Sequence, residues 1–200
     1  IQSLRTQVGT EALAVMPRAV ADAENAAPLY EQAEAALKAD VPEEARQIAN
    51  DFVDPKSAEA TAFLGHAQAA LTLFRRAADK AGCRFPGDGI QPNLESVITH
   101  LEALRHGAML IALAARREAA EGHAASALTD VARIGRIGQH AATSPLLIGD
   151  LTSIAIDALA SDTLAQVLPQ ARQVSALDAI GPMDPTVPGA LLARALRGEE

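Results

Sequence analysis

The feature that most constrains this chain is a series of apolar stripes at helical spacing, each bounded by residues that start or stop helices. The clearest stripe follows Asn93, an N-cap residue, and ends at Gly122. The composition of the chain agrees with this pattern: 49% of its residues are hydrophobic, and only 2% are aromatic. Alanine and leucine, which favour helices, dominate over the strand-forming residues. The sequence therefore predicts an all-α fold.

Capping residues, prolines and glycines set the expected helix boundaries. They predict helices over 28–38, 43–51, 55–81, 94–121, 124–142 and 146–168, with short helices over 174–180 and 186–197. Short connections make neighbouring helices antiparallel. We expect an irregular helical bundle or a short α-solenoid of antiparallel hairpins. Residues 115–135 are tetratricopeptide-like, although the chain has no clean 34-residue repeat.

The domain organisation follows from the lengths of these helices. We expect residues 1–200 to form a single helical domain, in which 1–22 are an irregular lead-in and 56–168 are the long-helix core. Residues 169–200 carry the short helices, and their last helical pattern runs to Glu200, as it would in a fragment of a longer protein. Because 146–168 is apolar nearly all round, we expect it to be the central helix.

Charge and cysteine content exclude several classes of protein. The net charge of -8 opposes binding to nucleic acid and to anionic lipid. A single cysteine, Cys83, excludes an internal disulfide framework and a cysteine-based zinc site. No run of about 18 apolar residues indicates a membrane span. We therefore expect any membrane attachment to come from a segment outside this sequence.

One pair of polar stripes is the main candidate for a site. Arg133, Arg136 and His140 share a face of the helix 124–142, and Asp150 and Asp157 share a face of the helix 146–168. In an antiparallel hairpin, Arg136 comes level with the stretch from Asp150 to Ser153, and Arg133 comes within reach of Asp157. Such a seam is either a charged groove that holds a ligand or metal, or an interhelical ion-pair seam that fixes the register. We favour the ion-pair seam.

The other chemical candidates have simpler structural explanations. The loop 83–91 contains Cys83 beside Arg84, which favours a thiolate, but no base is placed beside it in the sequence. Its Gly-Asp-Gly turn matches neither a phosphate loop nor a calcium loop. Glu102 and His106 share a helix face but lack the spacing of a bundle di-iron site. We therefore assign no catalytic, cofactor-binding or metal-ligating residue, and we expect no cofactor.

Several segments resemble a known family. NAAPLYEQA (25–33), RRAADKAGCRFP (75–86), SPLLIGDLTSIAIDAL (144–159) and ALRGE (195–199) are similar to a family of uncharacterised helical envelope proteins of planctomycete-type bacteria. This resemblance implies a bacterial envelope location and a membrane-spanning segment ahead of the matching region; a cytoplasmic location is the alternative. It carries no catalytic residues.

These observations predict a non-enzymatic scaffold that presents a helical surface to a protein or peptide partner. The alternative is a small-molecule or metal-binding protein, or an enzyme, that uses the seam of Arg133, Arg136, Asp150 and Asp157 or the loop 83–91. A homo-oligomer is compatible with either function. The partner itself is not encoded in any recognisable motif.

Overall fold

All regular structure in the described part of the chain is helical, which confirms the predicted all-α fold. The computed structural model describes residues 20–46, 53–86, 93–144 and 146–170. Within these ranges no strand occurs; Asn25 and Gly82 form only an isolated parallel bridge. Most of the predicted lead-in 1–22 and the short helices predicted over 174–180 and 186–197 lie outside the described residues.

The helices occur along the chain in the order that the sequence predicts. They are the 3-10 turn η1 (Asp22–Glu24), α2 (Ala27–Asp40), α3 (Glu43–Arg46), α4 (Ala58–His66), α5 (Gln68–Ala78), α6 (Leu94–Ala120), α7 (Ala124–Ala141), α8 (Leu147–Val167) and the 3-10 turn η3 (Leu168–Gln170). The side chain of Asn93 caps α6 by accepting a hydrogen bond from the amide of Glu95 at 3.0 Å. Gly122 follows α6 with a φ of 89°, a conformation that glycine adopts without strain.

The prediction of one continuous helix over 55–81 was wrong. The helix begins later, because Ser57 is the residue whose side chain accepts a hydrogen bond from the amide of Ala60, at 3.0 Å. It is then divided at Ala67, whose φ of -83° and ψ of 5° depart from helical geometry. The result is two shorter helices, α4 and α5, in place of one long one.

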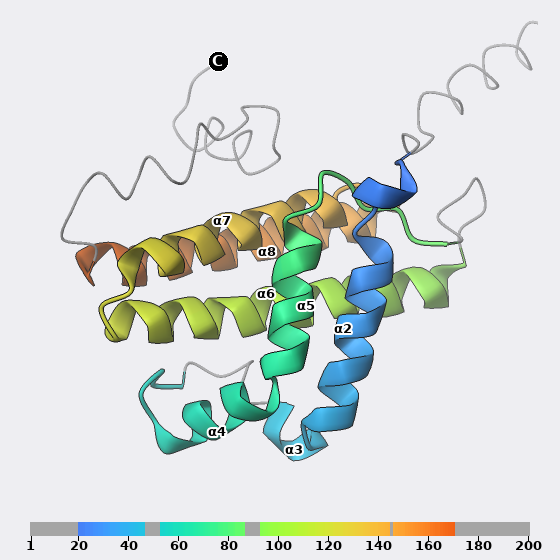
Figure 1. Ribbon diagram of the computed structural model, residues 1–200. Helices are drawn as coiled ribbons and strands as arrows, with labels where there is room; N and C mark the ends of the chain where they lie inside the picture. Colours follow the sequence, from blue (N-terminus) through green and yellow to red (C-terminus); the bar gives the residue numbers. More distant parts are fainter. Residues whose placement is uncertain (1–19, 47–52, 87–92, 145, 171–200) are drawn as a thin grey trace, which may run out of the picture.

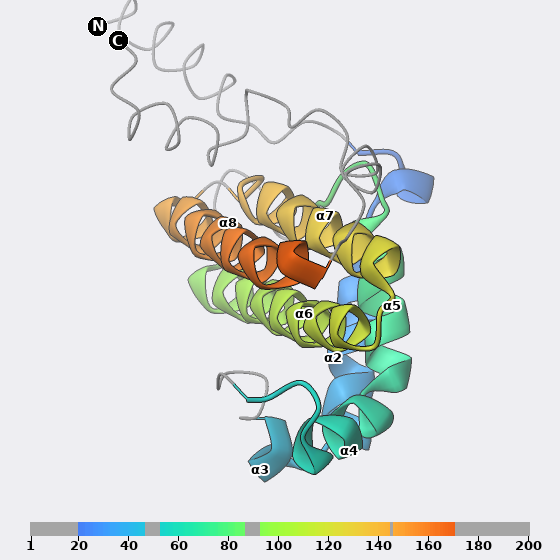
Figure 2. The same ribbon diagram turned by 90° about the vertical axis from the view of Figure 1, so that its left-hand side faces the viewer.

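The long helices form two groups that cross each other. Helices α6, α7 and α8 lie side by side, and α2 and α5 lie side by side and run across them (Figure 1). Viewed along the first group, α8 lies on the side of α6 and α7 that faces away from α2 and α5 (Figure 2). Helix α6 contacts α2, α4, α5, α7 and α8, so it is the central helix.

The prediction that 146–168 is the central helix was therefore wrong. Nearly half of the 27 residues of α6 are buried, whereas α8 buries only Gly149, Ser153, Ile156, Thr163 and Val167. The main core also extends beyond 56–168, because α2 contributes Tyr30, which is fully buried with its ring centroid 6.2 Å from that of Phe74.

The packing of α6 against α5 is close enough to need a glycine. A Cβ at Gly107 would lie 2.4 Å from Cδ1 of Phe74, which is well inside van der Waals contact. Phe74 is itself completely buried. Gly107 therefore allows the aromatic ring of α5 to pack directly against the backbone of α6.

Two of these helices are long and apolar enough to cross a membrane by length and composition alone. They are Leu94–Ala120 and Leu147–Gln170, each with a best window of mean hydropathy 1.2. In α6, 61% of that window is buried inside the fold, as in the core helix of a globular domain, whereas in α8 only 22% is buried. The two helices thus have similar apolar compositions, but the apolar residues of α6 are mostly buried in the core, whereas most of those of α8 lie at the surface.

Candidate interaction site

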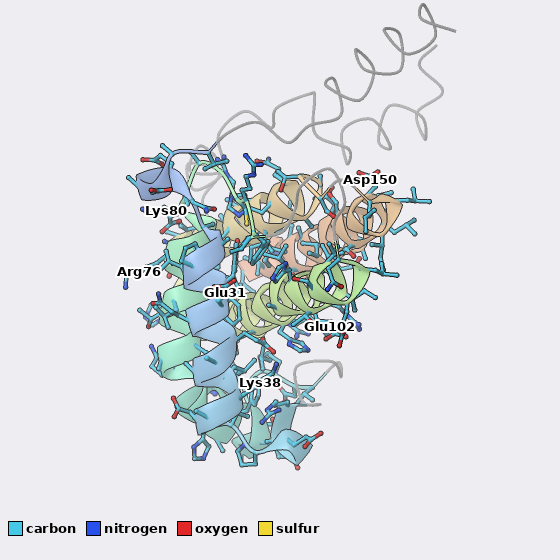
Figure 3. The ribbon with its side chains drawn as sticks, turned by 90° about the vertical axis from the view of Figure 1, so that its right-hand side faces the viewer. Glu31, Lys38, Arg76, Lys80, Glu102 and Asp150 are labelled. Carbon is cyan, nitrogen blue, oxygen red and sulfur yellow. The ribbon has the colours of Figure 1, made fainter. Side chains whose placement is uncertain are left out.

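The predicted seam between α7 and α8 does not form as expected. Arg133 pairs with Asp79 through two contacts of 2.8 and 2.9 Å, and with Asp130 at 3.0 Å, so its guanidinium group is held by carboxylates other than the one expected. Arg136 and Asp150 are exposed. In Figure 3, Asp150 lies at the start of α8, far from Arg76 of α5 and from Lys80, which follows α5. The stripe of Arg133 and His140 therefore faces α5 and α2, and α8 packs against a different face of α7.

Asp157 lies at the contact between α7 and α8. Its carboxylate approaches the α7 backbone so closely that a Cβ at Gly138 would lie 2.7 Å from its Oδ1 atom. The face of α7 that meets α8 is thus the one carrying Gly138. The sequence predicted two polar stripes, but the helical phase that decides which neighbour each stripe meets was not visible in it.

Arg133 belongs to a closed cluster of ion pairs between α5, α6 and α7. Arg75 of α5 binds Glu118 at 2.6 Å and also pairs with Asp130, which is completely buried. Burial raises the pKa of Asp130, and the hydrogen bonds from Arg75 and Arg133 counteract that rise. The pKa of Arg133 is raised by its hydrogen bonds to the carboxylates of Asp79 and Asp130. Because the guanidinium groups already have carboxylate partners, this cluster fixes helix register and offers no charge to a ligand.

His140 is a buried structural histidine. Its Nε2 atom lies 3.2 Å from the carbonyl oxygen of Lys80, and its Nδ1 atom lies 2.8 Å from the hydroxyl of Tyr30. A carbonyl only accepts, so Nε2 carries the proton and Nδ1 accepts from Tyr30. Burial and, less strongly, the nearby charge of Arg136 lower the pKa of His140 to about 4, although the hydrogen bond to the Lys80 carbonyl opposes them. The imidazole is therefore neutral and joins α2, α7 and the turn after α5.

The described part of the loop 83–91 is held by hydrogen bonds to two other segments. The side chain of Asn25 accepts from the amide of Arg84 at 2.8 Å and donates to its carbonyl at 3.0 Å. The hydroxyl of Thr143 donates to the carbonyl of Cys83 at 3.0 Å. Cys83 is buried, which removes its thiol from contact with a substrate. Residues 87–91 of the predicted loop lie outside the described residues.

Two further histidines, His100 and His106, serve packing and ion pairing. The ring of His100 stacks on that of Phe85 with centroids 4.1 Å apart, and Nδ1 of His106 lies 3.1 Å from the carboxylate of Glu34. Burial opposes ionisation of Glu34, but His106 and Lys38 outweigh it and lower its pKa. Among the described residues, no three histidine, cysteine, aspartate or glutamate side chains gather closely enough to hold a metal ion.

The inner face of α8 is built mainly from small residues. Gly149, Ser153, Ile156, Ala160, Thr163 and Val167 follow each other at intervals of four and three, and all except the half-buried Ala160 are buried. Small side chains let helix backbones approach closely: a Cβ at Gly149 would lie 2.9 Å from the carbonyl oxygen of Ala141 in α7. The larger side chains of α8 are consequently on other faces.

The outer face of α8 exposes those larger side chains. Leu147 is 72% exposed, Leu151 58% and Ile154 40%; Ile148 is also exposed, as is Leu168, which directly follows α8 as the first residue of η3. Leu94 and Ile98 of α6 are exposed as well. Single exposed leucines are common on proteins, but a contiguous apolar face on one helix marks an interaction site. We call the exposed apolar side chains of α8 the α8 outer face.

A shallow groove lies along the border between α6 and α8. It has a volume of about 460 Å³ and is lined by Arg105 and Met109 of α6 and by Leu151, Ala155 and Leu159 of α8. The lining is mainly apolar, with a single guanidinium group. A groove of this kind fits the apolar side chains of another polypeptide better than a polar small molecule.

Sequence reasoning missed this surface because an all-round apolar helix usually indicates burial. The signal that separates the two cases is side-chain size. In α8 the residues at alternating intervals of four and three on one face (149, 153, 156, 160, 163 and 167) are mainly small, and only Ile156 and Val167 among them are larger. That face therefore suits close packing, and most of the bulky side chains are left for the outside.

Comparison of the chain with protein-family models, with curated proteins and with solved structures gave no match. The site is therefore interpreted from its own geometry.

Proposed function

We propose that this chain is a non-enzymatic helical interaction domain that binds a polypeptide through the α8 outer face and the neighbouring groove. One observation carries the proposal: Leu147, Leu151 and Ile154 are among the most exposed large apolar side chains of the described residues and lie on one helix. Contact with a partner would remove this apolar area from water. Each square ångström buried contributes roughly 25 cal/mol to the free energy of binding.

The architecture supports this function. Helices α6 and α7 contact α8 on one side and leave its other side exposed. We propose that the fold is an irregular bundle of antiparallel hairpins that is tetratricopeptide-like around α6 and α7. A rigid helix presents its side chains in fixed positions, which lowers the entropic cost of binding.

The alternative of an enzyme or small-molecule site has less support. Arg133 is held by Asp79 and Asp130, His140 is buried and bonded on both ring nitrogens, and Cys83 is buried. A catalytic group needs access to its substrate, and a binding charge needs to be unpaired before the ligand arrives. The α8 outer face is exposed and apolar, and such a surface is suited to partner binding.

Site-specific photo-crosslinking in the native cell tests this proposal. A benzoylphenylalanine at position 151, on the α8 outer face, is expected to crosslink to one defined polypeptide, either another copy of the chain or a different protein. The same amino acid at position 31, exposed on α2, is the control. Adding Ile154→Glu should abolish the crosslink. The proposal is contradicted if position 151 crosslinks no more than position 31, or only within its own chain.

A location in the bacterial envelope, with a membrane anchor outside this sequence, is a further proposal that rests on the resemblance in 25–33, 75–86 and 144–159. Fractionation of the native cell with an antibody to the domain tests it. Recovery in the cytoplasmic fraction would contradict it.

A further inference from the structure

The α8 outer face carries an uninterrupted stripe with the spacing of a coiled-coil seam. Its members alternate at intervals of four and three residues, and every one is exposed: Leu147, Leu151, Ile154, Ala158, Ser161, Ala165 and Leu168. This spacing keeps one line of side chains directed at a parallel or antiparallel partner helix. The stripe therefore fits another helix along the whole length of α8.

The sizes of these side chains are distributed so that the stripe complements itself in the antiparallel direction. The first half carries large side chains and the second half mainly small ones. If two copies of α8 pack antiparallel about a point close to residues 157 and 158, Leu151 lies near Ala165 and Ile154 faces Ser161, so these layers combine a large and a small residue. Ala158 then meets Ala158 at the centre, and Leu147 meets Leu168 at each end. In a parallel pair, Leu151 would face Leu151 and Ala165 would face Ala165, which crowds one end and leaves gaps at the other.

The charges next to the stripe favour the same arrangement. Residues 147–170 contain Asp150, Asp157 and Asp162 but no lysine or arginine, so the complementary charge comes from another element. Arg105 of α6 lines the groove beside Leu151 and Ala155. Asp162 lies seven residues after Ala155, so it is on the same, groove-facing side of α8.

The antiparallel register brings these two groups together across the contact. Asp162 of the second copy comes level with Ser153 of the first. Ser153 belongs to the turn of α8 that lies next to Arg105. A two-fold axis in the contact plane keeps the α6 sides of both helices on the same side, so the pair of Arg105 and Asp162 forms twice. Within one chain, Asp162 lies about 10 Å further along α8 than Ala155, which lines the groove with Arg105.

We propose that the chain forms a two-fold homodimer in which the α8 outer faces of two copies pack antiparallel. This inference rests on the proposed function and names the partner as a second copy. The acidic residues also argue against a lipid surface as the occupant, because helices that lie on membranes carry lysine and arginine on their polar face.

Sedimentation of the full 200-residue chain tests the dimer. At tens of micromolar we expect a species of twice the 20.8 kDa chain mass. The double variant Leu151→Glu, Ile154→Glu should weaken dimerisation by roughly 100-fold or more, since it puts four carboxylates into the apolar contact. Unchanged circular dichroism confirms that the variant folds, and Arg76→Glu on α5, remote from α8, is the matched control.

A charge exchange tests the register independently of apolar burial. Arg105→Glu and Asp162→Arg should each weaken the dimer by about tenfold, because each leaves two like-charged contacts. The combined variant should return to within about threefold of the wild type, because the pair forms again with reversed charges. The opposite exchange, Glu31→Arg with Arg76→Glu, lies on α2 and α5 and should change nothing.

A wild-type chain that stays monomeric at hundreds of micromolar overturns the inference, as does a dimer that survives Leu151→Glu, Ile154→Glu. Failure of the combined charge variant to recover overturns the antiparallel register. Flotation of the monomer with phosphatidylcholine and phosphatidylglycerol vesicles would assign the face to a membrane instead. If the chain is monomeric but position 151 crosslinks to a different protein, the homodimer fails and the proposed function stands.

Discussion

Acidification should destabilise this fold through His140 in particular. The buried imidazole is neutral, accepts from Tyr30 and donates to the carbonyl of Lys80. Its pKa falls from the ordinary value of 6.5 to about 4 because burial penalises the charged form. Between pH 6.5 and about pH 4, His140 is therefore protonated in the unfolded chain but neutral in the folded chain. The stability contributed by the neutral histidine is complete above that pH and is lost as the pH falls toward 4.

The size of this effect follows from the pKa difference. Each unit of pKa difference corresponds to about 1.36 kcal/mol, so the full loss amounts to about 3 kcal/mol. Between about pH 7.5 and about pH 4.5, where most of the titration lies, we expect about 2.5 kcal/mol. This is a large fraction of the stability of a domain of this size.

Urea unfolding followed by circular dichroism at several pH values provides the assay. Other groups also titrate in this range, so the quantity to compare is the pH dependence of the wild type with that of His140→Gln. The variant should be less stable at neutral pH, but its free energy of unfolding should fall by about 2.5 kcal/mol less on acidification. His66→Gln, at an exposed position on α4, is the control and should keep the wild-type dependence. Parallel pH profiles for the wild type and His140→Gln would refute the reasoning.

Four further substitutions test the packing and the buried polar groups. Gly107→Ala should destabilise the fold by about 1–3 kcal/mol because the added Cβ would overlap Phe74. Gly135 has open space around it, so Gly135→Ala should leave the stability unchanged or raise it by up to about 1 kcal/mol. Equal effects of the two substitutions in thermal unfolding would contradict this reasoning. Asp130→Asn should cost about 3 kcal/mol in urea unfolding because it breaks a buried ion-pair cluster, and a loss below about 1 kcal/mol would show that the cluster contributes little. Ser153→Ala should leave stability unchanged or raise it by up to about 1 kcal/mol, since its buried hydroxyl has no hydrogen-bond partner; a clear loss would reveal a missing partner.

Local signals in the sequence defined most of the helix boundaries. Asn93 and Gly122 bound α6 as predicted, because capping and left-handed backbone geometry depend on single residues and their nearest neighbours. The break at Ala67 was not predicted: alanine is a good helix former, and the nearest weak helix former, Gly65, lies inside α4 and was not taken as the end of a helix.

The relative placement of the helices depended on information that lies outside any one segment. Arg133 and Asp157 were expected to meet, but the phase of α7 directs Arg133 toward Asp79 of the turn after α5. The burial of α8 was also misjudged, because hydrophobic content gives no information on which helix lies between the others. The small residues Gly149, Ser153 and Thr163 indicate the packed side only once the neighbours are known.

Pulsed electron paramagnetic resonance between spin labels on two copies tests the α8 contact most directly. In a Cys83→Ser background, a label at Ala158, near the proposed two-fold axis, should give a distance below about 20 Å. A label at Gln166 should give a separation along the helix axis of about 25 Å, since 17 residues of helix lie between the two positions. Equal short distances at both positions would indicate a parallel pair, and the absence of dipolar coupling at Ala158 would contradict the account that the α8 outer face binds a second copy.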